Sequence, residues 1–357
     1  MKYIIVIMKN IALAASLLAG LLACGTNVAL AEQVPQENPE HATLVFEGVK
    51  EVINQEGLYI LNRHTDSLWK REGINNIAEN RARTQTCIRI IFKTDSRVIK
   101  PVFTRREGTL DRAVNNYYGV YRNGVFVKDY PGTDLVIESD GSVNEWMLVL
   151  PIMYGVNFKG IEIDEGAQFF EVTAREKRPI YIAIGDSITH GAGLKGCSSV
   201  LSYPYVLAEE NGYNLYNTAI GGSQISPGLA YEYADIPADY VTVMWGYNDW
   251  NALKGDLTEI KARYKGLLEN LLATQKKAKI YCILPTVAAD ENGGAGYASD
   301  LQGVRDAERE VVLSLNSSRL IIVDGKSMTD VSGLNGQVHF NNEGSVRFGK
   351  KLAAYVK

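Results

Sequence analysis

The alternation of strand-like and helix-like segments after Pro179 limits the possible folds of this chain more than any other feature. Short apolar runs rich in β-branched residues alternate there with longer stretches of helical periodicity. The expected strands cover residues 180–184, 215–217, 240–244, 278–284 and 320–323, and the expected helices cover 203–210, 257–276, 303–315 and 344–355. Strands that alternate with helices favour a parallel sheet covered by helices on both faces. We therefore expect a doubly wound α/β domain with a five-stranded parallel sheet over residues 179–357.

Residues 32–174 show a different sequence pattern, in which short strand-like segments alternate with frequent turns. β-Branched and aromatic residues concentrate in 87–93, 98–103, 118–121, 125–127, 134–138, 145–150 and 158–163. Asn123 and Gly124 form a dipeptide typical of a β-hairpin turn. The pattern favours an antiparallel, jelly-roll-like β-sandwich. A charged linker, 174–179, separates the two regions, and a chain of 357 residues exceeds the roughly 250–300 that one core serves, so we expect two domains.

The first 31 residues have the composition of an export signal. Two lysines accompany an apolar core, residues 11–23, that is too short to span a bilayer, and residues 29–31 fit a small-residue cleavage site. Alternatively, the segment that ends at Cys24 resembles a bacterial lipoprotein box in which Cys24 carries a lipid. Both interpretations predict an exported protein, periplasmic or extracellular, without a membrane span. Only the second adds a lipid anchor, as in an outer-membrane lipoprotein.

The charge and cysteine content argue against several classes of partner and cofactor. The chain has 37 basic and 41 acidic residues, interspersed, and a formal net charge of −4 at pH 7. This balance gives no electrostatic footprint for nucleic acid or for an anionic membrane surface. Beyond the signal, only Cys87, Cys197 and Cys282 remain, and they lack the Cys-x-x-Cys spacing of a metal site.

Ser187 is the first candidate for chemistry. It follows the strand 180–184 directly, within the sequence Ile-Gly-Asp-Ser-Ile-Thr at 184–189. Open α/β sheets bind ligands at the carboxyl edge of their strands, which is where this hydroxyl would lie. Asp186 and Ser187 could instead simply cap the next helix. Ser187 is therefore a candidate nucleophile whose assignment depends on finding a base.

A base for Ser187 can be sought by elimination among the four histidines. His41 lies near the amino terminus, His64 belongs to the β region, and His190 is too close in sequence to turn back to the hydroxyl. His339 remains, in a loop between the fifth strand and the last helix. In a doubly wound sheet this loop reaches the same edge as Ser187. We expect His339 to be the base, against the alternative of a surface or helix-capping histidine.

Acyl transfer also needs donors that stabilise a developing oxyanion. The loop after the second strand, 217–223, contains Gly221 and Gly222, where backbone N–H groups can approach a ligand closely. The segment after the third strand, 245–249, offers the uncharged side-chain amide of Asn248. A serine, a glycine turn, an asparagine and a histidine, each following a strand, form a combination typical of an acyl-transfer site.

These four segments resemble the characteristic blocks of the GDSL-type SGNH hydrolases. The matching residues are Gly-Asp-Ser at 185–187, Gly222, Gly-x-Asn-Asp at 246–249, and His339. The resemblance implies a three-layer α/β/α domain with flavodoxin-like strand order and no metal or organic cofactor. It also implies that Ser187 is the nucleophile, that His339 is its base, and that the oxyanion hole consists of the Ser187 N–H, the Gly222 N–H and the Asn248 amide.

One position departs from the family pattern. The family usually places an aspartate three residues before the catalytic histidine, where this chain has Gly336. That acid orients the imidazole. Asp330 or Asp324 could replace it if the loop folds back, and we take Asp330 as the candidate third member. Alternatively, a backbone carbonyl orients His339, and the pair works as a Ser-His dyad.

The whole arrangement is similar to two-domain bacterial esterases with an amino-terminal β-sandwich. Residues 150–167, which lead through the linker to Ser187, carry this looser likeness. Such enzymes include the sugar deacetylases of carbohydrate esterase family two, some of which rely on a Ser-His dyad. The likeness therefore supports the architecture better than the substrate.

Aromatic residues beside Asn248 point to a class of substrate. Tyr247 and Trp250 flank the expected donor and could provide faces on which sugar rings pack. We expect an exported serine esterase that removes small acyl groups, acetyl in particular, from a polysaccharide or glycan. Two alternatives stay open: a lipid or thioester hydrolase of the same fold, and a non-catalytic carbohydrate-binding surface protein, which Gly336 would permit.

Overall fold

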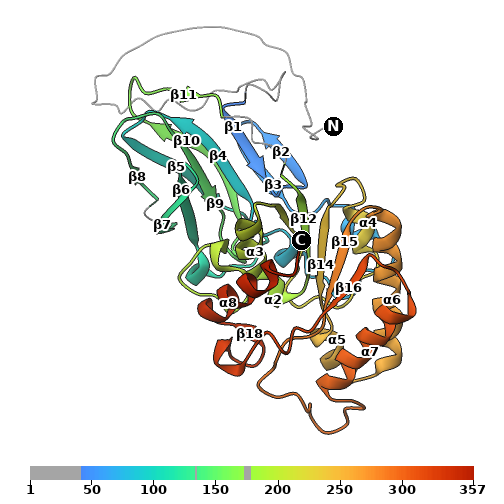
Figure 1. Cartoon of the computed structure of the whole chain (residues 1–357). Coiled ribbons are helices and arrows are strands. Elements are labelled where there is room, and N and C mark those ends of the chain that lie inside the picture. The colour runs from blue at the N-terminus through green and yellow to red at the C-terminus, as the bar shows by residue number, and fades with distance from the viewer. Residues whose placement is uncertain (1–41, 133–134, 173–177) are drawn as a thin grey trace.

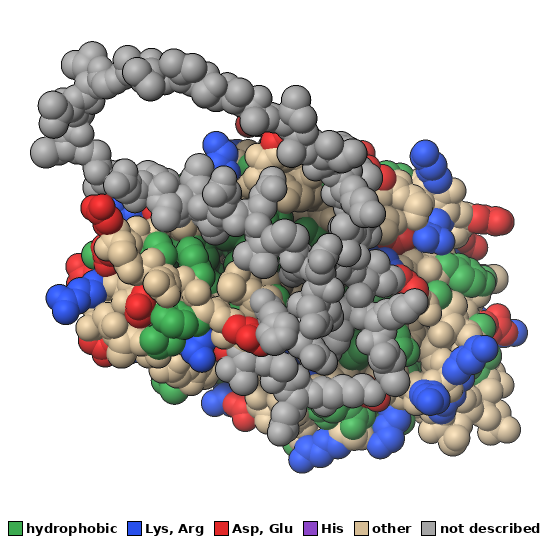
Figure 2. Space-filling model, turned by 90° about the horizontal axis from the view of Figure 1, so that it is seen from above, with side chains coloured by type: hydrophobic (Ala, Val, Ile, Leu, Met, Phe, Trp, Pro, Cys, Tyr) green, Lys and Arg blue, Asp and Glu red, His purple; other side chains and the backbone are tan. Residues whose placement is uncertain are grey.

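The computed structural model describes residues 42–132, 135–172 and 178–357. The expected export signal with Cys24, and most of the linker 174–179, lie outside these ranges. Within them, no helix combines the length and the apolar character that crossing a membrane requires. Charged side chains of both signs occur at several places on the face shown in Figure 2.

The amino-terminal half is a sandwich of two antiparallel sheets (Figure 1). One sheet has the order β1-β4-β9-β6-β7, with β11 also paired to β4, and the other has the order β2-β3-β10-β5-β8. The strands are β1 (Leu44–Glu47), β2 (Glu51–Gln55), β3 (Leu58–Asn62), β4 (Arg89–Thr94), β5 (Val98–Arg105), β6 (Tyr117–Arg122), β7 (Val125–Pro131), β8 (Ile137–Glu138), β9 (Asn144–Val149), β10 (Val156–Ile163) and β11 (Phe169–Phe170). Phe92, Trp146 and Phe158 belong to the buried core of the sandwich. The predicted β-sandwich is confirmed.

The carboxyl-terminal half contains a five-stranded parallel sheet with helices on both faces (Figure 1). Its order is β13-β12-β14-β15-β16. The strands are β12 (Ile180–Gly185), β13 (Asn214–Asn217), β14 (Tyr240–Met244), β15 (Lys279–Ile283) and β16 (Leu320–Val323). One face carries α3 (Tyr203–Asn211) and α8 (Asn342–Ala353), and the other carries α6 (Leu257–Thr274) and α7 (Leu301–Ser314). This flavodoxin-like strand order confirms the predicted three-layer fold.

Short elements complete the fold, and several lie where strands end. They are the helices α1 (Glu79–Ala82), α2 (Ser187–His190), α4 (Leu229–Glu232) and α5 (Tyr247–Ala252), the 3₁₀ helices η2 (Leu68–Lys70), η3 (Ala113–Asn115), η4 (Ser199–Leu201) and η5 (Val331–Gly333), and the hairpin of β17 (Leu334–Asn335) and β18 (His339–Phe340). Periodicity did not predict these elements, because a segment of fewer than two turns is too short to show a repeat.

The two halves share an apolar interface, because strands β4 and β9 are buried on both faces. Ile90 and Leu148 belong to the core of the sandwich. Ile91 and Met147, one residue along each strand, belong to the core that also contains the parallel sheet. Alternation of side chains across a strand produces this division. The sandwich is therefore packed directly against the α/β half.

A buried ion-pair network also joins the halves. Arg89 on β4 is fully buried and pairs with Glu47 of β1 at 3.3 Å and with Glu209 of α3 at 3.2 Å. Arg178, just before β12, pairs with the same Glu47 at 2.5 Å. Removal of Arg89 would leave Glu47 with Arg178 alone and would deprive Glu209 of its buried partner.

Replacement of Arg89 with alanine should lower the free energy of unfolding by about 3–5 kcal/mol, because two carboxylates lose their shared partner at a buried interface. Arg122→Ala is the matched control. Arg122 pairs with Asp140 at 2.5 Å near the surface, where such pairs contribute little to stability. Urea unfolding followed by circular dichroism measures both variants. Equal losses would contradict a dominant role for the buried network.

Candidate active site

Ser187 stands at the carboxyl end of β12, where the strand turns directly into α2. Asp186 is the N-cap of that helix, and its carboxylate accepts a hydrogen bond from the Ile188 N–H at 2.9 Å. Gly185 leaves no room for a side chain, because a Cβ there would lie 2.5 Å from the Met244 carbonyl oxygen. This tight strand-to-helix turn places Ser187 at the edge of the sheet.

His339 reaches the same edge from β18. Its Nε2 lies 2.8 Å from the Ser187 Oγ, which is hydrogen-bond distance, although 152 positions separate the two residues. Gly193 packs closely beside β18, since a Cβ at Gly193 would lie 2.7 Å from the His339 Cβ. The structure therefore brings together the two residues that sequence analysis paired.

The predicted third member, Asp330, does not contact His339. Asp330 is exposed, its carboxylate accepts a hydrogen bond from Ser332, and it pairs with Arg347 at 3.5 Å. The 3₁₀ turn that Asp330 caps uses its carboxylate locally, so the loop does not fold back as the sequence suggested. Within the described ranges, no carboxylate accepts a hydrogen bond from the other ring nitrogen of His339. The arrangement has the geometry of a Ser-His dyad.

The glycine loop after β13 is held by His190, for which sequence analysis found no role. The Gly221 N–H donates to His190 Nδ1 at 3.0 Å, which assigns the proton of the neutral ring to Nε2; this nitrogen lies 2.9 Å from the Thr84 hydroxyl and 3.2 Å from Arg63 Nη2. That hydroxyl in turn donates to the Arg81 carbonyl at 2.7 Å. Burial, together with nearby cations, holds the pKa of His190 well below its ordinary value. The ring therefore stays neutral and keeps its acceptor for the loop.

Arg63 anchors the same loop from the amino-terminal half. Its Nη1 donates to the carbonyls of Asn217 and Ala219 at 2.8 Å each, and its Nε donates to the Thr84 carbonyl at 2.7 Å. Burial lowers the pKa of Arg63 to about 10, so the side chain remains charged at neutral pH. A single arginine after a short strand has no local signal that could have revealed this contact.

The three expected oxyanion donors differ in the hydrogen-bond acceptors that they have in the structure. Within the described ranges, the backbone N–H groups of Ser187 and Gly222 donate to no other residue. Asn248 Nδ2 donates to the Ser223 carbonyl at 2.9 Å and to the Asp186 carboxyl group at 3.3 Å. Burial raises the pKa of Asp186 to about 7. A substrate oxyanion would find two free backbone donors and would compete for the third.

Residues 183–347 match the model of the GDSL-like Lipase/Acylhydrolase family. This part of the chain is therefore similar to a GDSL-like lipase/acylhydrolase domain. The matched range includes Ser187 and His339, so the family assignment supports an acyl-removing hydrolase. No curated protein matches the chain in sequence.

Solved structures extend the likeness to the amino-terminal half. The salicylyl-acyltransferase SsfX3 from a tetracycline biosynthetic pathway is 17% identical, with a TM-score of 0.72, 88% of this chain covered and 95% of that one. A protein from Bacteroides ovatus described as a GDSL-like lipase is 20% identical, with a TM-score of 0.70 and coverages of 88% and 97%. A family two carbohydrate esterase from Clostridium thermocellum, solved with cellohexaose, is 16% identical, with a TM-score of 0.60 and coverages of 76% and 92%. These matches show a shared two-part fold.

The aromatic residues beside Asn248 in the GDSL-like domain do not form an exposed platform. Trp250 is only 2% exposed, donates from Nε1 to the Ser299 carbonyl at 2.8 Å, and packs against Tyr297. The prediction that Trp250 offers a face to sugar is therefore wrong, because its position on α5 turns the ring into the core. Tyr247 is half-buried and lines a small pocket.

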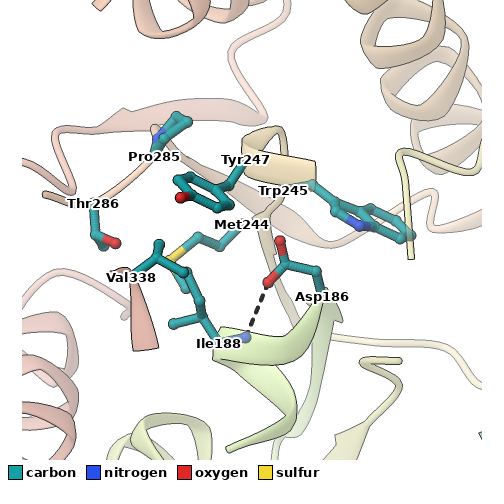
Figure 3. A pocket seen from close by; sticks show the side chains of 8 residues that line it. All are labelled: Asp186, Ile188, Met244, Trp245, Tyr247, Pro285, Thr286 and Val338. Carbon is teal, nitrogen blue, oxygen red and sulfur yellow. Dashed lines mark hydrogen bonds between the residues drawn. The ribbon is translucent and has the colours of Figure 1, made fainter. Parts of the chain in front are cut away.

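Figure 3 shows this pocket, whose lining includes residues adjacent in the chain to Ser187 and His339. Its volume is about 10 Å³, close to the minimum for one water-sized group. It is lined by Asp186, Ile188, Met244, Trp245, Tyr247, Pro285, Thr286 and Val338. Ile188 follows Ser187 in the chain, and Val338 precedes His339, so two walls of the pocket adjoin the two reacting residues. Within the described ranges, no group of His, Cys, Asp and Glu side chains is arranged to hold a metal ion.

The pH dependence of ester hydrolysis should reveal the environment of His339. Burial, and then the positive charge of Arg112, lower the pKa of His339. A base must be neutral to accept the Ser187 proton, so the acidic limb of kcat/KM should lie below the ordinary histidine pKa of about 6.5. Arg112→Gln removes one cause and should move that limb to higher pH. A wild-type limb above this value, or a limb unmoved in the variant, would contradict the assignment.

Proposed function

We propose that this protein is an exported serine esterase that removes small acyl groups, acetyl in particular, from a carbohydrate. The observation that carries the proposal is the 2.8 Å contact between His339 Nε2 and Ser187 Oγ at the strand edge of a GDSL-like domain. A hydroxyl, a neutral base and free backbone donors in one place suit acyl transfer through serine.

The proposed reaction has two halves. His339 Nε2 accepts the Ser187 hydroxyl proton while Oγ attacks the ester carbonyl carbon, and the resulting oxyanion faces the N–H groups of Ser187, Gly222 and Asn248. When this intermediate collapses, the ester C–O bond breaks, and protonated His339 gives its proton to the leaving sugar oxygen. Water, deprotonated by His339, then attacks the acyl-enzyme. Collapse of the second intermediate releases the carboxylic acid and restores Ser187.

The size of the pocket supports a small acyl group. A pocket that barely holds one water-sized group leaves least room for long acyl chains, so it favours the smallest acyl groups, such as acetyl. In Figure 3 the side chains of Ile188, Met244 and Val338 lie close together and would meet a longer chain. A lipid hydrolase needs a larger apolar site, so this pocket favours an acetyl ester over the lipid alternative.

Different observations support the proposed carbohydrate substrate and the proposed export of the protein. Solved structures of the same fold include carbohydrate esterases, one of them holding cellohexaose. Residues 1–31 have the composition of an export signal. A non-catalytic binding protein would have no need of the Ser187–His339 contact, so that contact favours an enzyme over the binding alternative.

Ser187→Ala should reduce hydrolysis of p-nitrophenyl acetate by at least about a thousandfold, because no other group in the site replaces the nucleophile. His339→Ala should cause a loss of similar size. Ser327→Ala, which changes an exposed serine of the same half, is the matched control and should keep full activity. Release of p-nitrophenol gives the rates, and circular dichroism shows whether each variant folds. Turnover retained by folded Ser187→Ala would refute the mechanism.

Enlargement of the pocket should change the preferred acyl chain. Val338→Ala and Ile188→Ala remove buried methyl groups from its wall, and the ratio of kcat/KM for butyrate to that for acetate should rise by about fourfold for each methylene accommodated. Val312→Ala shortens a buried valine of α7 that does not line the pocket, so this control should leave the ratio unchanged. Chain-length profiling with p-nitrophenyl esters measures the ratio. An unchanged ratio in both pocket variants would mean that the acyl group binds elsewhere.

A further inference from the structure

Arg81, from the amino-terminal half, places a positive charge against the glycine loop of the active site. Its Nη1 donates to the Gly221 carbonyl at 2.8 Å. The guanidinium also packs so closely on Gly222 that any Cβ at that position would collide with it. Because the Gly222 N–H is a proposed oxyanion donor, this cation lies beside the place where the ester would bind.

Arg112, from the same half, belongs to a segment that contacts the loop 193–196 beside His339. Arg112 is the N-cap residue of η3. Two residues later, the carbonyl of Val114 accepts a hydrogen bond from the Gly196 N–H at 3.2 Å. Gly193, three residues earlier in that segment, packs against His339. The charge of Arg112 contributes, after burial, to lowering the pKa of His339. Arg112 itself is exposed to solvent.

Among the described residues these two arginines have no acidic partner, in contrast to a close neighbour. Arg83, two residues after Arg81, pairs with Asp66 at 3.0 Å and with Glu79 at 2.5 Å. Across the described part of the chain, neither Arg81 nor Arg112 forms an ion pair with a carboxylate. The contact with the glycine loop uses one N–H group of Arg81, and the remaining N–H groups of both guanidiniums have no protein acceptor among the described residues.

We propose that Arg81 and Arg112 bind a carboxylate of the substrate, so that the acetyl ester belongs to an acidic sugar such as a uronate. This inference rests on the proposed function and names its substrate class. Guanidinium groups form strong, charge-assisted hydrogen bonds with carboxylates, and the positive charges of Arg81, beside the glycine loop, and of Arg112, which acts on His339, attract an anion to the site. The carboxylate belongs to the sugar, because an apolar pocket of about 10 Å³ has no room for a charged acyl group.

A cation beside the glycine loop could instead stabilise the oxyanion directly. That role would raise kcat for every ester, charged or neutral. Carboxylate binding affects charged esters selectively and acts mainly through KM, because the carboxylate is bound in the ground state as well as in the transition state. Kinetics with a matched pair of substrates therefore separates the two roles.

The test compares an acetylated methyl galactoside with the corresponding methyl galactosiduronate, the methyl glycoside with a free carboxylate, and the two differ only by that carboxylate in place of the exocyclic hydroxymethyl group. Acetate release gives kcat and KM for each. The wild type should prefer the uronate, and added salt should weaken the preference by screening. Arg81→Gln and Arg112→Gln should each reduce the preference by about tenfold or more, chiefly through KM. Arg83→Gln, whose arginine already has acidic partners, is the matched control and should keep the preference.

Two further measurements separate the esterase function from carboxylate binding. Hydrolysis of p-nitrophenyl acetate tests the esterase function independently of any sugar charge. NMR titration of the Ser187→Ala variant with both sugars reports binding even where turnover is absent. The inference is overturned if the wild type treats both sugars alike in turnover and binding. It is also overturned if the arginine variants lose activity equally on both, which would assign Arg81 to the oxyanion. Absence of p-nitrophenyl acetate hydrolysis with selective uronate binding would instead refute the esterase and keep the carboxylate site.

Discussion

The buried guanidinium of Arg63 is the interaction on which the shape of the active site depends. A charge in the interior is costly unless hydrogen bonds compensate for it. Here the compensation comes from carbonyls of both halves: Thr84 from the amino-terminal half, and Asn217 and Ala219 from the start of the glycine loop. His190 then fixes the next part of the loop through the Gly221 N–H. The loop can take this shape only with the amino-terminal half folded against it, so the sandwich is a structural component of the site.

The sequence could predict the parts of the molecule that depend on local pattern and topology. All five parallel strands lie within a few residues of their expected positions, since apolar runs bounded by turns are a strong local signal. Ser187 and His339 could be paired because both follow strands of one parallel sheet, and such sheets bring strand ends to one edge whatever the details of packing. Elimination was possible only because the chain has so few histidines.

Contacts between segments that are far apart in the sequence have no local pattern that predicts them. Arg63 reaches Ala219 across 156 positions, and Arg81 reaches Gly221 across 140, yet nothing in the composition around either arginine marks it. Trp250 was misjudged for a related reason. An aromatic residue beside a polar donor indicates a sugar platform only if the ring is exposed, and exposure depends on tertiary packing that the sequence around it does not reveal. Asp330 likewise satisfies its carboxylate within its own turn, which spacing alone could not show.

The pKa values of three buried acids in the carboxyl-terminal half bear on the charge of the active site. Burial raises the pKa of Asp186 to about 7 and that of Asp249 to about 6, and it raises the pKa of Glu308 well above its ordinary value. Within the described ranges, neither oxygen of Glu308 has a hydrogen-bond partner, and its carboxyl group packs against Gly246, where a Cβ would collide with it. A carboxyl group that keeps its proton adds no negative charge near the oxyanion loop. At neutral pH Glu308 is therefore uncharged, whereas Asp249 is mostly ionised and pairs with Arg263 at 3.3 Å. The missing charge of Glu308 favours both an anionic substrate and the negative charge that develops during acyl transfer.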